Sequence, residues 1–362
     1  MQPTSTVKHL TSLPTAPTGP TATARWTPVL EAALAIVLAA APQALRTSLV
    51  GAGATFPYPI YSAWFAAYGR LKPDLQISYQ SVGSGDGIRQ LMDQFVFFGA
   101  TDTPMTEQEL FDAPARIVHV PTVVGAVVPI YNIPGLHTEL KFTGPVLADI
   151  FLGRITSWND PALVRLNEGV TLPPIEISPV FRADRSGSSF IWSDFLSKVS
   201  PEWRRLVGAN RASTLPIGLT AKGSEGMSAL VKQTPGTIGY VELIYASRNA
   251  LDVGLVQNAE AEFVRASIAS MSAAAHAAVG KMPRDLRVSI TNAPGKGVYP
   301  LSSFTWLLLY ESQRDRQRSR QMVDFIRWAL RDGQQMAPGL GYAPLPSAIV
   351  PLATAMLEKI KT

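Results

Sequence analysis

The chain contains no cysteine among its 362 residues and only four histidines. The absence of cysteine excludes disulfide bonds, thiolate catalysis, cysteine-ligated metals and a bacterial lipid anchor on an N-terminal cysteine. The histidines stand far apart, at His9, His119, His137 and His276, and no two have the spacing of a metal-binding pair. We therefore expect neither a metal nor another cofactor.

Charged residues are also scarce, at 16% of the chain, and the net charge is only +5. So mild and dispersed a positive charge is too small to favour nucleic-acid binding. The hydrophobic fraction of 46% predicts a compact globular protein rather than a disordered one. A chain of this length can bury one large core or two ordinary ones.

The N-terminal region has no apolar run long enough to cross a bilayer as a stable helix. The run from Val29 to Ala41, interrupted by Glu31, instead has the length of a signal-peptide core, and Arg25 precedes it. The leader is long, and only Ala39–Ala41 and Ala44 offer a cleavage site. We expect residues 1–48 to be a signal-like leader of an exported protein that is not a lipoprotein. A wrongly assigned start codon and an uncleaved anchor remain alternatives.

From Leu49 onward, short apolar runs alternate with stretches of helical periodicity. Strands are predicted at 48–52, 75–81, 97–100, 118–128, 175–181, 236–241 and 304–310, and helices near 60–68, 88–95, 147–153, 158–163, 190–199, 223–231, 259–278 and 322–331. This alternation predicts an α/β fold with mixed sheets flanked by helices. The long β-branched run from Val118 to Val128 is expected to cross between two lobes.

The segment Arg182–Phe190, with the sequence RADRSGSSF, is the most informative stretch of the chain. Hydroxyls and free backbone N–H groups at a helix start, beside an arginine, make an anion site. We expect Asp184 to fix the orientation of Arg182, so that its guanidinium presents a planar fork to an oxyanion. Ser186, Gly187 and Ser188 add further donors. The alternative is a structural ion pair at a domain edge.

Two further segments have the same character: GATF at 53–56, and GSGDG at 83–87. Thr55 and Ser84 can each offer a hydroxyl there, although an ordinary helix cap or a glycine turn would look similar. Ligands of open α/β sheets bind beyond the carboxyl ends of the strands, where all these segments fall. The sequence therefore predicts one anion held in a cleft between two lobes, with hinge closure as the motion.

Asp102, which follows the predicted strand at 97–100, is an unexpected member of an anion site. A carboxylate should repel an anion unless the ligand carries a proton that the carboxylate can accept. Hydrogen phosphate and dihydrogen phosphate carry one, whereas sulfate at neutral pH does not. One buried acceptor therefore discriminates strongly between the two oxyanions.

Five motifs in this order resemble the periplasmic phosphate-binding proteins of the high-affinity phosphate ABC transporter. They are GAGATFP at 51–57, YQSVGSG at 79–85, FGATDTP at 98–104, RADRSGSSF at 182–190 and PGTIGYVE at 235–242. The resemblance implies a type II periplasmic-binding-protein fold, with one lobe formed by 49–123 and 300–362 and the other by 124–299. It implies a monomer that performs no catalysis, binds inorganic phosphate and delivers it to a membrane permease. The implied phosphate ligands are Thr55, the Phe56 N–H, Ser84, Asp102, Arg182, Ser186, the Gly187 N–H and Ser188, with Asp184 supporting Arg182.

The chain departs from the family pattern at three positions. Ser188 stands where threonine is usual, while Asp86 and Arg185 replace glycine or another small residue. We hypothesise that Asp86 and Arg185 pair across the cleft and latch its closed form. The alternative is two solvated charges at the rim, which would contribute little.

Other functions remain open from the sequence alone. Arsenate has the same protons as phosphate, and sulfate is a further rival oxyanion. A phosphatase on the same scaffold would need a base beside Ser84 or Ser186, or metal ligands, and no histidine lies near either serine in the sequence. A surface-bound scaffold or adhesin that keeps the fold is a third possibility.

Overall fold

The computed structural model describes residues 46–212 and 215–362, and the residues from Arg46 to Thr362 form one compact unit. Residues 1–45 of the predicted leader lie outside the described residues. The first strand already begins at Thr47, within the last residues assigned to that leader.

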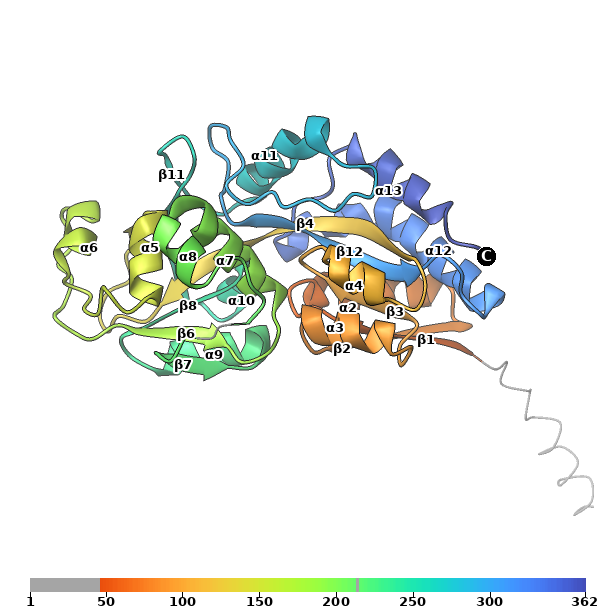
Figure 1. Cartoon of the computed structure of the whole chain (residues 1–362), viewed down its shortest axis with the longest axis horizontal. Helices are drawn as coiled ribbons and strands as arrows, with labels where there is room; N and C mark the ends of the chain where they lie inside the picture. Colours follow the sequence, from red (N-terminus) through yellow and green to blue (C-terminus); the bar gives the residue numbers. More distant parts are fainter. Residues whose placement is uncertain (1–45, 213–214) are drawn as a thin grey trace, which may run out of the picture. The chain divides into compact units, whose positions relative to one another are not determined.

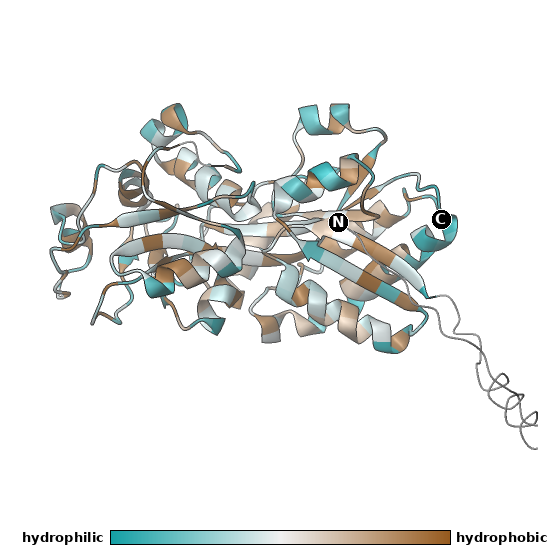
Figure 2. Ribbon diagram, turned by 90° about the horizontal axis from the view of Figure 1, so that it is seen from below, coloured by the Kyte–Doolittle hydropathy of each residue, from teal (hydrophilic) through white to brown (hydrophobic). Residues whose placement is uncertain are grey.

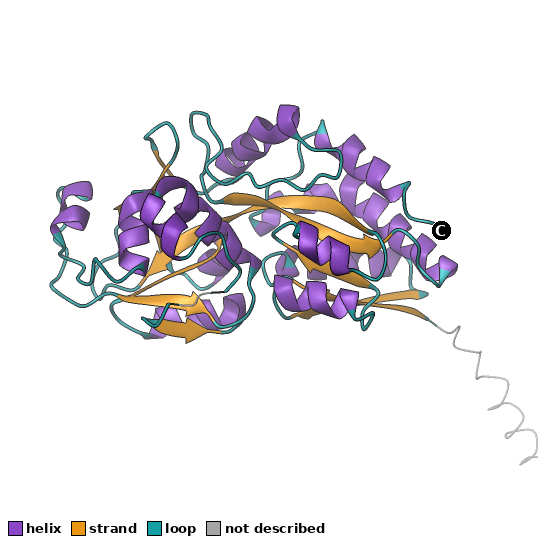
Figure 3. Cartoon of the chain, viewed as in Figure 1, coloured by secondary structure: helices purple, strands orange, loops and turns teal. Residues whose placement is uncertain are grey.

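Strands and helices alternate along the chain, as predicted (Figure 3). The strands are β1 (Thr47–Gly53), β2 (Leu75–Ser81), β3 (Phe98–Thr101), β4 (Ile117–Tyr131), β5 (Lys141–Phe142), β6 (Ser178–Arg182), β7 (Leu219–Ala221), β8 (Thr237–Glu242), β9 (Asp252–Val253), β10 (Leu255–Gln257), β11 (Phe263–Val264) and β12 (Ser302–Tyr310). The α-helices are α2 (Tyr58–Leu71), α3 (Ser84–Met92), α4 (Glu107–Asp112), α5 (Gly144–Phe151), α6 (Pro161–Leu166), α7 (Gly187–Val199), α8 (Pro201–Leu206), α9 (Gly223–Gln233), α10 (Leu243–Arg248), α11 (Ile268–Ala278), α12 (Arg316–Arg331) and α13 (Ile349–Leu357).

The main sheet has the strand order β2-β1-β3-β12-β4-β8-β6-β7, with β9 also paired to β4. The pairs β2–β1, β1–β3, β8–β6 and β6–β7 are parallel, whereas β12 and β4 run antiparallel to their neighbours. Strands β11, β10 and β5 form a separate small sheet. The mixed α/β architecture expected from the sequence is therefore confirmed.

Strand β4 connects two halves of the fold, as its length predicted (Figure 1). Its residues Ile117 to Ala126 pair with β12, and Val127 to Tyr131 pair with β8. We call β1, β2, β3, β12 and the helices α2, α3, α4 and α12 the first half, and β6, β7, β8 and the helices α7, α8, α9 and α10 the second half. The exact assignment of residues 49–123 with 300–362, and of 124–299, to two lobes stays a prediction.

Hydrophobic residues run along the central strands, as Figure 2 shows by colour. All nine residues of β12 are buried, and so is every residue of β4 after Ile117. Strands that are buried on both faces have continuous apolar runs rather than alternating ones, because no face meets water. These two strands therefore form the buried centre of the described fold.

Two expected helices differ from the structure. Helix α3 ends at Met92, and Phe95 is 77% exposed, because Gln94 adopts a left-handed backbone with φ of 59°. The helix expected over 259–278 starts only at Ile268. Before it, the Asn258 side chain accepts hydrogen bonds from the N–H groups of residues 260 and 262, which forms a turn instead.

Within residues 46–212 and 215–362, no helix has both the length and the apolar character needed to cross a membrane.

Candidate functional site

The predicted anion-binding residues lie directly beyond the carboxyl ends of four strands. Thr55 and Phe56 follow β1, Ser84 follows β2, and Asp102 follows β3. Arg182 is the last residue of β6, and the loop after it leads into α7. The side chains of Thr55, Ser84, Asp102, Arg182, Ser186 and Ser188 are all buried, each with 3% or less of the residue exposed.

Gly187 shows how closely the two halves approach each other. A Cβ atom added to Gly187 would lie 2.4 Å from Ser84 Oγ and 2.6 Å from Asp102 Oδ2. Nearby, the N–H of Gly85 donates a hydrogen bond of 2.8 Å to the carbonyl of Arg185. The first turn of α7 therefore packs against the first turn of α3 and the end of β3, so the predicted segments at 83–87 and 182–190 meet here.

Arg182 and Asp184 form a buried, bidentate ion pair. Arg182 Nε and Nη2 donate to the two carboxylate oxygens of Asp184 at 2.8 and 2.6 Å, and the N–H of Gly223 also donates to Asp184, at 2.9 Å. Burial alone would raise the pKa of Asp184, but these hydrogen bonds and the arginine charge lower it overall. The carboxylate is thus ionised and holds the guanidinium plane, as the sequence predicted.

The Arg182 guanidinium also reaches the first half. Its Nη2 donates to Thr55 Oγ1 at 3.2 Å, and Thr55 Oγ1 lies 2.7 Å from Ser224 Oγ. Ser224 belongs to the first turn of α9, so a fourth helix start lies beside the site. The sequence marked this helix start but gave no reason to include Ser224.

Asp102 accepts hydrogen bonds from hydroxyls on two elements. Thr305 Oγ1 in β12 donates to Oδ1 at 2.8 Å, and Ser84 Oγ lies 3.4 Å from Oδ2. Burial raises the pKa of Asp102 to about 7, and the hydrogen bond from Thr305, the charge of Arg182 and the bond from Ser84 oppose that rise. A carboxylate with this pKa exchanges its proton near neutral pH, where phosphate also does.

Two buried donors of the site have no hydrogen-bond partner within the described part of the chain: Arg182 Nη1 and Ser188 Oγ. Leaving such a group unpaired costs about 1–3 kcal/mol, and more for a charged group. Ser186 Oγ, which caps α7 by accepting from the N–H of Ser189 at 3.3 Å, keeps its own hydrogen to donate. The site therefore combines open donors with one acceptor, which suits an anion that carries a proton.

Three tyrosines, which sequence reasoning missed, hold the loop that carries Thr55 and Phe56. Tyr79, Tyr245 and Tyr342 donate to the backbone carbonyls of residues 54, 55 and 56, at 2.8, 2.8 and 2.6 Å. Because Tyr245 and Tyr342 come from distant parts of the chain, no local sequence pattern could connect them to this loop.

The structure does not contain the predicted ion pair between Asp86 and Arg185. Asp86 Oδ1 instead pairs with Arg89 Nη2 at 3.2 Å, one turn further along α3. Residues three positions apart are neighbours on a helix surface, so Arg89 is the nearer partner. Arg185 is exposed; its carbonyl accepts from the N–H of Gly85 and its side chain lies over Gly85 in α3, but it forms no ion pair with Asp86. The latch hypothesis for this pair is therefore not supported.

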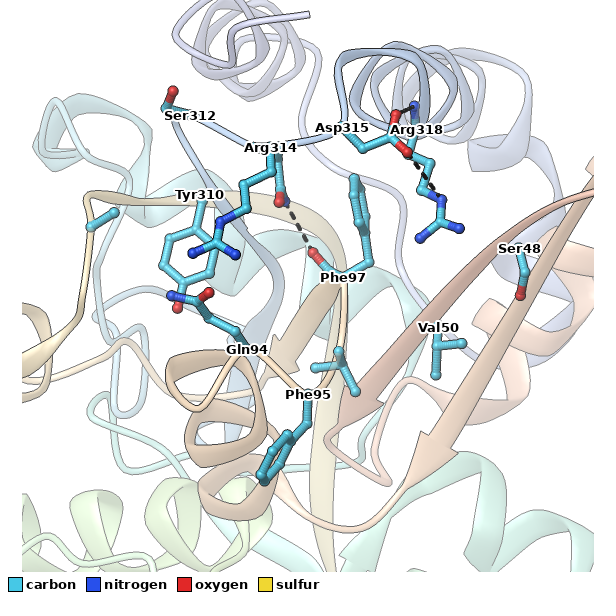
Figure 4. Close-up of a pocket in the computed structure, with 13 residues that line it drawn as sticks. Ser48, Val50, Gln94, Phe95, Phe97, Tyr310, Ser312, Arg314, Asp315 and Arg318 are labelled. Carbon is cyan, nitrogen blue, oxygen red and sulfur yellow. Dashed lines mark hydrogen bonds and ion pairs between the residues drawn. The ribbon is translucent and has the colours of Figure 1, made fainter.

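A cavity of about 480 Å³ lies away from this site, between β1 and the connection from β12 to α12 (Figure 4). Its lining includes Ser48, Phe95, Tyr310, Arg314 and Arg318, and none of the predicted anion ligands. The predicted anion site is therefore identified by its buried polar groups and not by this cavity. Among the residues described, no three histidine, aspartate or glutamate side chains are grouped so that they could hold a metal ion.

Comparison with known proteins places this chain in a family. Residues 38–332 match the PBP superfamily domain. The chain is 40% identical over 311 residues to the phosphate-binding protein PstS of Xylella fastidiosa strain Temecula1, a match that covers 86% of this chain and 85% of the relative. It is 39% identical over 304 residues to the phosphate-binding protein PstS of Pasteurella multocida, covering 84% and 88% of the two chains.

Solved structures agree on the fold. The ancestral soluble variant of the human phosphate binding protein matches with a TM-score of 0.68 at 22% identity, covering 86% of this chain and 93% of the other. The periplasmic phosphate-binding protein PfluDING matches with a TM-score of 0.66 at 20% identity, covering 87% and 93%. The two-lobed periplasmic-binding fold is therefore shared, and by its sequence this chain belongs to the PstS family of phosphate-binding proteins.

Proposed function

We propose that the protein captures inorganic phosphate in the cleft between its two halves and delivers it to an ABC-type phosphate permease. The observation that carries this proposal is the position of Asp102. It is a buried acceptor next to Ser84 and Gly187, in a site whose other side chains are donors. A ligand that matches such a site must accept several hydrogen bonds and donate one.

Each predicted ligand then has a defined part in binding. Arg182 supplies the positive charge, held by Asp184, and its free Nη1 donates to a phosphate oxygen. The hydroxyls of Thr55, Ser84, Ser186 and Ser188 and the N–H groups of Phe56 and Gly187 supply the remaining donors. Asp102 accepts a hydrogen bond from the phosphate hydroxyl. It disfavours a fully deprotonated oxyanion, because the carboxylate and an anion oxygen would then face each other as two acceptors without a hydrogen between them.

The wider biological role follows from the same proposal. The relatives are named phosphate-binding protein PstS, which favours a solute-binding subunit without catalytic activity. We propose that it is exported to the periplasm, binds phosphate there as a monomer, and docks on the permease subunits of the transporter. The lobe formed by 49–123 with 300–362 would close on the lobe formed by 124–299 around the anion.

Tryptophan fluorescence offers a direct test. Trp192 in α7 stacks on Tyr240 with ring centroids 4.9 Å apart, and the Tyr240 hydroxyl lies 2.8 Å from Ser189 Oγ, next to the site. Titration with phosphate should give saturable binding, and titration with sulfate should give far weaker binding. Arsenate should compete with phosphate because it carries the same proton. Equal affinity for sulfate and phosphate, or no saturable phosphate binding, would contradict the proposal.

A further inference from the structure

Arg211, on the connection after α8, reaches from the second half of the fold to the first. It is only 7% exposed, and its two terminal nitrogens bind both carboxylate oxygens of Glu109 in α4. Its Nη2 also donates to the carbonyl of Pro104 at 3.0 Å. Pro104 and Glu109 follow Asp102 closely in the chain. The guanidinium therefore binds the segment that follows Asp102, the proposed hydrogen-bond acceptor.

The backbone of Arg211 contacts the opposite wall of the same site. Its carbonyl accepts a hydrogen bond of 2.9 Å from the N–H of Ser186, the residue that caps α7. One residue therefore contacts the start of the helix that offers Ser186, Gly187 and Ser188, and also the segment that carries Asp102. Arg287 also holds the segment after Asp102, by pairing with Glu107 and donating to the carbonyl of Met105, but among the described residues none of its ion pairs or hydrogen bonds reaches α7.

Helix α4 depends on such polar contacts for its position. None of its six residues is buried, so apolar packing contributes little to holding it. Thr106 and Glu109 form a capping box, which fixes the glutamate to the helix start. The position of Glu109 therefore helps to fix the position of the segment that begins at Asp102.

We infer that Arg211 is a positioning residue that, with Glu109, clasps the two halves of the fold around the bound anion. The inference rests on the proposed function, because it concerns the closed form of the same site. Both partners are largely shielded from water, at 8% and 19% side-chain exposure, whereas the Asp86–Arg89 pair is exposed at the rim. Shielded, bidentate pairs between two surfaces act mainly on the dissociation rate of a complex, whereas rim pairs contribute little.

The test measures phosphate association and dissociation by stopped-flow tryptophan fluorescence in Arg211→Lys, Glu109→Gln and the double variant. Lysine keeps the charge but cannot engage both oxygens, and glutamine keeps an oxygen for the capping box. Each single variant should release phosphate at least about tenfold faster with an unchanged association rate. The double variant should be no worse than the more severe single variant. The matched control is the exposed pair on α8, changed by Arg205→Lys and Glu202→Gln, which should leave both rates unchanged.

The melting temperature of the phosphate-free protein distinguishes a clasp from a purely structural contact. A clasp of the closed form predicts release rates that change while the phosphate-free melting temperature stays within about 2 °C of wild type. Three outcomes would each overturn the inference. The variants could release phosphate at the wild-type rate, the effects of the two changes could add in the double variant, or release could be faster only in proportion to a lower melting temperature. If the wild-type protein itself binds no phosphate, the proposed function fails and the clasp with it. If the wild-type protein binds phosphate and the variants release it at the wild-type rate, the clasp is contradicted and the proposed function stands.

Discussion

Gly187 and Asp102 come from opposite halves of the fold, yet a methyl group on Gly187 would lie 2.6 Å from Asp102 Oδ2. Real Cβ atoms do not approach oxygen that closely, so the glycine is required for the two walls to meet. The same methyl group would lie 2.4 Å from Ser84 Oγ. The two walls can therefore lie this close only because residue 187 has no side chain.

Gly187→Ala should weaken phosphate binding at least about a hundredfold, which corresponds to about 2.7 kcal/mol. The added methyl group keeps α7 from packing against Ser84 and Asp102, whereas the helix itself tolerates alanine well. Isothermal titration calorimetry measures the effect. Gly226→Ala in α9 is the control, because its new Cβ would meet nothing closer than 3.9 Å. Wild-type affinity in Gly187→Ala would mean that the bound form is more open than the structure described above.

Asp102→Asn should reduce the preference for phosphate over sulfate far more than it changes the fold. Asparagine presents an amide that can donate to a deprotonated oxyanion, so the penalty against sulfate disappears. We expect the ratio of the two dissociation constants to fall at least about tenfold, or about 1.4 kcal/mol. Competitive titration of each variant with both anions measures that ratio. An unchanged ratio would show that selectivity resides elsewhere in the site.

The same residue should make the phosphate-free protein less stable as the pH rises. Burial raises the folded pKa of Asp102 to about 7 from an ordinary 3.8, so the folded state holds a proton that the unfolded state has released. The free energy of unfolding therefore falls between about pH 4 and pH 7 and levels off above that range. From pH 5 to pH 8 this one group should lower it by about 2–3 kcal/mol.

Urea unfolding of wild type and Asp102→Asn at pH 5 and pH 8 isolates the contribution of Asp102 to the pH dependence of the free energy of unfolding. Glu242, whose pKa is raised mainly by burial, is present in both proteins, so only the smaller part of its shift that comes from the Asp102 charge differs between them. If wild type and variant lose equal stability over this pH range, Asp102 is not the buried acid that the structure indicates.

Asp184→Asn should both weaken phosphate binding and destabilise the protein, because it leaves the buried Arg182 charge without its counter-ion. Breaking one side of a buried pair costs about 3–5 kcal/mol. The lowered pKa of Asp184 means that its contribution is present above its unfolded pKa and is lost as the pH falls through the folded pKa. Urea unfolding at pH 7 should show the full loss in the variant. A phosphate-free stability equal to wild type would show that Arg182 finds another partner.

Local sequence patterns predicted the strands and the helix starts that carry the site. Thr55, Ser84 and Asp102 each follow a predicted strand, and Arg182 ends one. Because ligands of open α/β sheets bind beyond the carboxyl ends of the strands, their convergence could be foreseen. The helix expected over 259–278 was placed too early because composition outweighed the Asn258 turn.

Pairing between distant side chains could not be predicted in the same way. The sequence suggested Asp86 with Arg185, whereas the structure pairs Asp86 with Arg89 and joins Arg211 to Glu109, 102 positions apart. The partner of a charged side chain is decided by the packing of the halves, which no periodicity encodes. The hydroxyls of Ser224 and Thr305 were missed for the same reason.

The continuity of β4 means that the closure proposed above would break few backbone hydrogen bonds. Its partner changes from β12 to β8 at Ala126–Val127. Tilting one half against the other can therefore be absorbed as a change of twist in a single continuous strand, while the ladder on either side stays intact. The free energy gained when phosphate contacts its proposed ligands would then not be offset by the loss of hydrogen bonds in the sheet.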